Sequence, residues 1–284
     1  GRWLTDISEL MFLIEAGSQM GMRYRGANGY GLDIVAIFSD DPRKQHVAFS
    51  GKKLFTGGDF NQDYNNESQH VRQKNITIPN NATIVEIYSV ITGHGFGKVE
   101  ANCAEFCNHE HRYTFDSGWS VTEDHPMAGN TSTPSDREGC RKLSENGVVA
   151  NQLGSWPFGR AGWCAGQDVK PWVFDVSFQS TPGQQVSIQY EGLYDGQIYV
   201  PNVIGSGTNP TIRMESWLIF SKLHNGSNAG FSFLSIKNEI INESCLVNDS
   251  DTKNDYSSNK AHQSRIEVIV FRREMKVEND NRCK

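Results

Sequence analysis

The run Ile84-Val-Glu-Ile-Tyr-Ser-Val-Ile91 is the stretch that decides the type of fold. It is rich in β-branched and aromatic residues, which favour strands. Similar short apolar runs recur between turn-forming residues, at 113–115, 172–178, 186–190, 214–220, 231–236 and 266–272. Short strands at this spacing, with few helical periods among them, predict an all-β protein built as an antiparallel jelly-roll sandwich.

The chain upstream of these runs has a different pattern. Residues 4–16 repeat apolar side chains at helical spacing and form the one helix that we expect. Beyond it, residues 20–24 and 32–38 have the composition of strands and are followed by turn formers.

Two long segments have little alternation. Residues 56–75 are polar and predict a loop or interdomain connection, so we place a domain boundary between residues 55 and 56. Residues 1–55 would then end a first jelly-roll domain, and residues 56–284 would form a second. Residues 116–170 predict an extended loop held by disulfides rather than by a strand ladder.

The charge of the chain argues against two classes of partner. The formal net charge is -6, and no run of Lys and Arg exceeds two residues. We therefore expect neither nucleic acid nor an anionic membrane as a partner. No apolar stretch reaches the length that a membrane span needs.

Cysteines and glycosylation sequons point to the secretory pathway. The chain has 6 Cys, an even number that suits an oxidising compartment. Asn-x-Ser/Thr sequons begin at Asn66, Asn75, Asn81, Asn130, Asn225, Asn242 and Asn248. We expect a secreted or extracellular glycoprotein.

Three neighbouring motifs are the most specific part of the sequence. They are Thr92-Gly93-His94-Gly95-Phe96-Gly97, Cys103-Ala-Glu105-Phe-Cys107-Asn-His109-Glu-His111 and Gly159-Arg160-Ala161-Gly162-Trp163-Cys164-Ala165-Gly166. The order and spacing of these motifs resemble the C-terminal domain of the peptide-N-glycosidase F family. The resemblance covers residues 75–166 closely and the chain ends weakly.

The resemblance implies a fold and an activity. The family is built from two eight-stranded jelly rolls packed side by side. Its members cleave the amide that links an N-glycan to Asn, giving Asp and a glycosylamine, and they need no metal or other cofactor. An N-glycan on a glycoprotein is therefore the implied partner.

The resemblance also implies roles for particular residues. Glu105 and Arg160 are the implied catalytic pair, in which the guanidinium holds the carboxylate ionised through charge-assisted hydrogen bonds. His94 and Trp163 are the implied substrate-binding residues. The implied disulfides are Cys103–Cys107 and Cys140–Cys164, which leaves Cys245–Cys283 as a third pairing.

One part of the family pattern is missing. The family's catalytic Asp lies in the first jelly roll, in a stretch that this sequence does not contain. Either a separate N-terminal chain completes that domain or the sequence was trimmed, and we favour the partner chain. In addition, the sequence has Arg25-Gly26 near a second acidic position of the family, and Gly93-His94-Gly95 replaces a Gly-Trp-Gly turn.

A copper site is an alternative interpretation. His109 and His111, two residues apart on a strand, place both imidazoles on one face. With Met214 they resemble one copper site of the peptidylglycine and dopamine copper monooxygenases, whose paired jelly rolls are similar, and imidazole with thioether favours copper. A third possibility is a non-catalytic extracellular module that binds glycan or protein.

Overall fold

A computed structural model describes residues 5–14, 34–38, 46–67, 70–95, 104–129, 136–150, 154–198, 209–223 and 267–271. The chain divides into two compact units, Gly1–Leu13 with His46–His224, and Ile14–Gln45 with Asn225–Lys284. In the second unit, β1 (Ile34–Phe38) pairs antiparallel with β11 (Glu267–Phe271).

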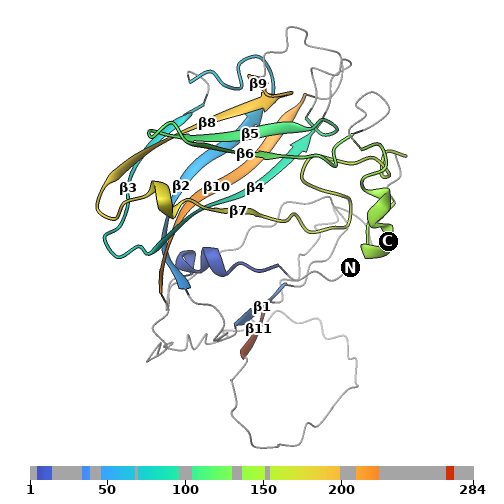
Figure 1. The fold of residues 1–284 in the computed structure, drawn as a ribbon. Helices are drawn as coiled ribbons and strands as arrows, with labels where there is room; N and C mark the ends of the chain where they lie inside the picture. Colours follow the sequence, from blue (N-terminus) through green and yellow to red (C-terminus); the bar gives the residue numbers. More distant parts are fainter. Residues whose placement is uncertain are drawn as a thin grey trace, which may run out of the picture. The chain divides into compact units, whose positions relative to one another are not determined.

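The first unit is a sandwich of two antiparallel sheets (Figure 1). One sheet has the order β2 (His46–Asp59), β10 (Thr211–Leu223), β4 (Ile84–His94) and β7 (Trp172–Asp175). The other has the order β3 (Gln73–Thr77), β8 (Gln185–Tyr194), β5 (His109–Phe115) and β6 (Ser120–Asp124), and β9 (Gln197–Ile198) pairs with β8. This architecture confirms the predicted all-β, antiparallel, jelly-roll-like sandwich.

Strict alternation along β5 shows why these residues form a sandwich. Every second side chain of β5, beginning with His109, is buried, and the residues between them are partly exposed. Tyr113 and Phe115 therefore enter the core, where Tyr113 and Tyr190 of β8 both pack against Phe55 of β2. Because a strand turns alternate side chains to opposite faces, the same period also directs two histidines into this apolar interior.

The helical content is smaller than predicted. The helix expected over residues 4–16 is, in the described residues, a 3₁₀ helix over Ser8–Leu13, called η1. Asp6 Oδ1 accepts a hydrogen bond from Ser8 N at 2.9 Å at its start, and Phe12 packs edge-on against Trp217 of β10. This short 3₁₀ helix is sufficient to pack an apolar side chain against the sheet, so a long α-helix is not needed. Two other 3₁₀ helices are η2 (Arg141–Asn146) and η3 (Ser177–Gln179).

The segments predicted as loops are partly strand. β2 continues without interruption through residues 55 and 56 to Asp59, and Phe60 and Tyr64 just beyond it are fully buried. Within residues 116–170, β6 pairs with β5, which the weak sequence alternation did not indicate. The strand expected over 172–178 ends at Asp175. The strands expected at 20–24 and 231–236 lie outside the described residues.

Candidate functional site

The end of β4 and the turn after it hold the Glu105 carboxylate. Gly95 has a φ of 73°, in the left-handed region that glycine adopts without strain. Its carbonyl accepts a hydrogen bond from Glu105 N at 2.9 Å, and its own N–H donates to Glu105 Oε2 at 3.1 Å. The glycine-rich motif therefore positions the carboxylate through its backbone.

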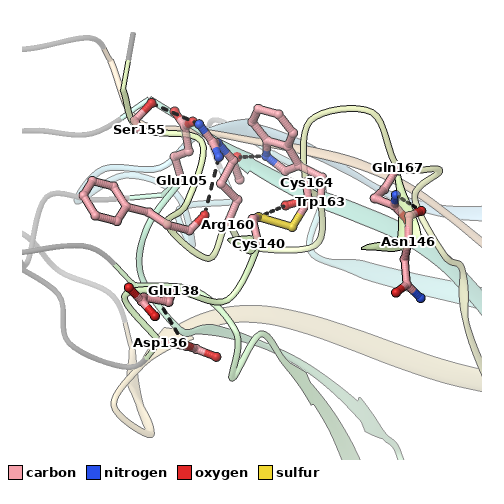
Figure 2. The surroundings of a disulfide bond; sticks show 12 residues. Glu105, Asp136, Glu138, Cys140, Asn146, Ser155, Arg160, Trp163, Cys164 and Gln167 are labelled. Atoms are coloured by element: carbon pink, nitrogen blue, oxygen red, sulfur yellow. Dashed lines mark hydrogen bonds and ion pairs between the residues drawn. A yellow bond between two sulfur atoms is a disulfide. The ribbon is translucent and has the colours of Figure 1, made fainter. Parts of the chain in front are cut away.

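Arg160 forms the second half of a charged pair with Glu105. Arg160 Nε lies 2.8 Å from Glu105 Oε1, and Arg160 Nη2 donates to Ser155 Oγ at 3.1 Å. The arginine side chain is only 2% exposed, whereas that of Glu105 is 17% exposed. Figure 2 shows the guanidinium between Glu105 and Ser155, with the Trp163 indole beside it.

Backbone hydrogen bonds join the three motif segments. Ala161 N donates to the carbonyl of Glu105 at 2.8 Å, and Gly93 N donates to the carbonyl of Ala161 at 3.0 Å. Trp163 Nε1 donates to the carbonyl of Gly93 at 2.8 Å. Residues far apart in the sequence thus form one local network, which brings together the four residues expected to act on or bind substrate.

The two expected substrate-binding residues stack on each other. The His94 and Trp163 rings have centroids 5.2 Å apart and are nearly parallel. The Arg160 guanidinium also lies over the Trp163 ring, 4.7 Å from its centroid. The indole therefore already has two stacking partners and supports the guanidinium. Burial, together with the positive charge of Arg213, lowers the pKa of His94, so the imidazole is neutral at pH 7.

A disulfide anchors the segment that carries Arg160. Cys140 and Cys164 are joined, the pairing that the family resemblance implies, and Figure 2 shows this bridge beside Trp163. Cys107 is also disulfide-bonded. Its expected partner Cys103 lies outside the described residues, as do Cys245 and Cys283, so those two pairings stay predictions.

The pair has a defined capacity for further hydrogen bonds. An ionised carboxylate offers about four lone-pair positions, and the two protein donors use two of them. In the described part of the chain, no second carboxylate forms a hydrogen bond or ion pair with Glu105 or Arg160. The site can therefore accept hydrogen bonds from hydroxyl or amide groups at one fixed, partly exposed acid.

Two of the expected copper ligands, His109 and His111, lie on one face of β5, as the sequence predicted. His109 and His111 are fully buried on β5, and a third histidine, His125, lies next to them. Met214 lies on β10 in the core cluster, where it is 7% exposed. Sequence reasoning missed His125, although extending the β5–β6 register by one residue places it opposite His109.

Comparison with known proteins places most of the sandwich in one family. A family model described as "Peptide-N-glycosidase F, C terminal" matches residues 60–224. No curated protein matches the chain.

Three of the solved structures that match this chain do so over about half of their own length. A crystal structure of peptide-N(4)-(N-acetyl-β-D-glucosaminyl)asparagine amidase is 19% identical, with a TM-score of 0.42, over 61% of this chain and 52% of that one. Recombinant peptide:N-glycanase F is 20% identical, with a TM-score of 0.43, over 62% and 53%. A glycosylasparaginase from Flavobacterium meningosepticum is 19% identical, with a TM-score of 0.41, over 62% and 53%. This chain therefore spans about half the length of the proteins it matches.

Proposed function

Because this chain belongs to the family of peptide-N-glycosidase F C-terminal domains, we propose that it acts on or binds the N-glycans of glycoproteins. The observation that carries the proposal is the Glu105–Arg160 pair, a partly exposed carboxylate fixed by a buried guanidinium and a backbone N–H. A carboxylate held in this way is prepared to accept hydrogen bonds from sugar hydroxyls or from the amide that joins a glycan to Asn.

Two residues support this acid in the proposal. Trp163 fixes the position of Arg160, because its ring contacts the guanidinium and its indole N–H donates to the backbone of β4. His94, half-buried and stacked on Trp163, offers its exposed edge to the glycan. The neutral imidazole adds a donor or acceptor to the same patch.

Hydrolysis would need more than this pair. Water must add to the amide carbonyl carbon, after which the carbon–nitrogen bond breaks and the glycosylamine leaves with a proton. Glu105 can orient the amide or the water, and a second acid has to activate the water. We propose that a separate N-terminal polypeptide supplies that acid and completes a first jelly roll beside the sandwich to which β2 (His46–Asp59) belongs.

The test uses a glycopeptide with an Asn-linked chitobiose core. The protein, purified with any associated polypeptide, is incubated with it, and mass spectrometry monitors conversion of Asn to Asp while calorimetry measures binding. We expect binding or conversion that Glu105→Gln and Arg160→Lys abolish. The matched control, Glu145→Gln on exposed η2, should behave as the unchanged protein. If the complete assembly neither bound nor converted the glycopeptide, the proposal would be overturned.

Binding without hydrolysis is the second candidate function. It is favoured because, among the described residues, no second carboxylate pairs with Glu105 or Arg160, and binding needs only the one acid. In the same glycopeptide experiment, such a module would bind the glycan and leave the Asn unconverted. The Glu105→Gln variant would lose this binding.

We also propose that the protein is a secreted glycoprotein. The Cys140–Cys164 bridge suits an oxidising compartment, and the sequon residues within the described ranges, Asn66, Asn75 and Asn81, are all exposed. In the described residues no helix has the length and apolar character to cross a membrane. Intact-mass analysis of protein from a eukaryotic secretory host, before and after enzymatic glycan removal, tests this proposal.

A further inference from the structure

The interior of the sandwich contains a cluster of three histidines that the proposed function does not use. His109, His111 and His125 each offer one ring nitrogen, and these atoms all lie within 4.8 Å of one another. The His109 ring centroid is 4.9 Å from that of His111 and 4.8 Å from that of His125. The residues are at most 6% exposed, so water does not solvate the cluster freely.

The hydrogen bonds of the cluster identify the protons. His109 Nε2 lies 3.0 Å from the carbonyl oxygen of Ala104, which can only accept, so Nε2 carries the proton and Nδ1 has the free lone pair. His111 Nε2 lies 2.8 Å from that His109 Nδ1 and donates to it. His111 Nδ1 then accepts from the Tyr190 hydroxyl at 2.6 Å.

One nitrogen of the cluster has no partner. His125 Nε2 is buried and makes no hydrogen bond. Burial holds the pKa of each of the three imidazoles below its ordinary value, to about 4 for His125, so all three are neutral. A buried polar nitrogen without a partner is uncommon in folded proteins, and a bound ion would satisfy it.

From this geometry we propose that His109, His111 and His125 bind a divalent transition-metal ion, with Zn²⁺ as the reference ion. Neutral imidazoles are preferred ligands of such ions, and three of them with an open fourth position form a common zinc set. His109 Nδ1, His111 Nε2 and His125 Nε2 would be the ligand atoms.

Binding requires one rearrangement that the surroundings permit. The His111 proton moves from Nε2 to Nδ1, where the Tyr190 oxygen accepts it, and Tyr190 then donates to the Tyr64 hydroxyl 2.8 Å away. Hydroxyl groups rotate to donate or accept, so the network reverses without losing a hydrogen bond between these groups. Ala104 and Tyr190 thus act as the outer partners that orient metal-bound histidines.

Ionisable side chains near the cluster include Arg72 and Glu123. Arg72 packs over the Tyr64 and Tyr190 rings and opposes a cation. Glu123 lies directly across from His111 in the β5–β6 pairing and has a buried carboxyl oxygen without a partner. Burial raises the pKa of Glu123 to about 8, so at pH 7 its carboxyl group is largely uncharged and does not offset Arg72 before an ion binds.

The bound ion would stabilise the turn that carries Glu105. His109 donates to Ala104, the residue before Glu105, so the cluster is tied to that turn by a direct hydrogen bond. The inference concerns a structural site and does not rest on the proposed glycan function.

The test loads the whole protein with zinc alone. Because the ligands are buried, the protein is refolded under oxidising conditions with ZnCl₂ or with EDTA, and then desalted. We expect one equivalent of retained zinc by elemental analysis and a higher Tm than in EDTA. Co²⁺ loading should give the visible absorption bands of a nitrogen-rich site.

Variants separate the proposed ligands from chance binding. His125→Leu should lower zinc affinity more than about 100-fold and Tyr190→Phe about 10- to 100-fold, as outer partners do. His46→Gln, a histidine outside the cluster, should retain the unchanged affinity. No retained zinc, or equal binding by His125→Leu, would overturn the proposal. Binding of copper instead, with loss in Met214→Leu, would overturn it in favour of the His109, His111 and Met214 set.

Discussion

The Glu105–Arg160 pair and the His109–His111–His125 cluster flank one short segment, yet they differ in how their polar atoms are satisfied. Ala104 accepts a hydrogen bond from His109 on the interior side, and the next residue, Glu105, binds Arg160 on the other. Among the buried polar atoms of the described residues, those of Arg160 all have partners, whereas His125 Nε2 has none.

This difference teaches what each cluster lacks. A charged pair whose atoms are already satisfied is organised in advance and can present its free oxygen lone pairs to a ligand. A buried neutral cluster with an orphaned nitrogen is complete only when something binds within it. The first should thus be sensitive to loss of a residue, and the second to loss of a ligand.

We expect the largest effect when the Glu105–Arg160 pair is broken. Arg160→Ala leaves Glu105 without its buried partner, and removing one member of a buried pair costs about 3–5 kcal/mol. Urea unfolding should show this loss. Arg141→Ala, which removes an exposed ion pair with Glu138, should change the free energy of unfolding by less than about 1 kcal/mol. Equal effects of the two variants would contradict the contrast.

Removal of the Cys140–Cys164 disulfide should destabilise the segment that carries Arg160 but not the histidine cluster. The Cys140→Ala and Cys164→Ala double variant removes a bridge between residues separated by 24 positions. Such a loop closure contributes about 3 kcal/mol to stability. We expect lower stability by calorimetry and faster proteolysis near Arg160, with zinc binding by the histidine cluster unchanged. A loss of zinc affinity would show that the two clusters are not independent.

Replacing the orphaned nitrogen should have the opposite sign. In EDTA, His125→Leu exchanges a buried, unpartnered group for an apolar one of similar size, and we expect a gain of about 1 kcal/mol in the free energy of unfolding. With zinc present, the same variant should be less stable than the unchanged protein. Destabilisation in EDTA would mean that His125 already has a partner.

The smallest expected effect is a pH dependence of stability that arises from His94, next to the charged pair. The pKa of His94 is lowered in the fold by burial, by Arg213 and by Arg160, and Glu105 opposes this shift. The unfolded chain therefore takes up the His94 proton first as pH falls below about 6.5, so the contribution of His94 to stability is full above that pH and declines below it. His94→Gln should reduce this decline between pH 7 and pH 5 in chemical unfolding. An unchanged pH profile would contradict the assignment.

Local pattern was sufficient for part of the structure. The short apolar run at 113–115 predicted a strand, and the resemblance of the motifs placed Glu105, Arg160, Trp163 and His94 in one candidate site, whose contacts the structure shows. Local pattern failed where the packing partner decides the structure of a segment. η1 is a short 3₁₀ helix that packs Phe12 on β10, and β6 is a strand because the neighbouring β5 pairs with it.

By itself, the sequence determined the class of fold, the two-residue period that sends His109 and His111 to one face, and the presence of Glu105 and Arg160 in two motifs of the same family. Only the tertiary structure decided that this face is the apolar interior, that His125 lies beside the other two histidines, and that His94 and Arg160 share the Trp163 ring. The physical reason is that periodicity fixes the side of a strand on which a residue lies. Burial and partners depend on which strands and loops pack against that side.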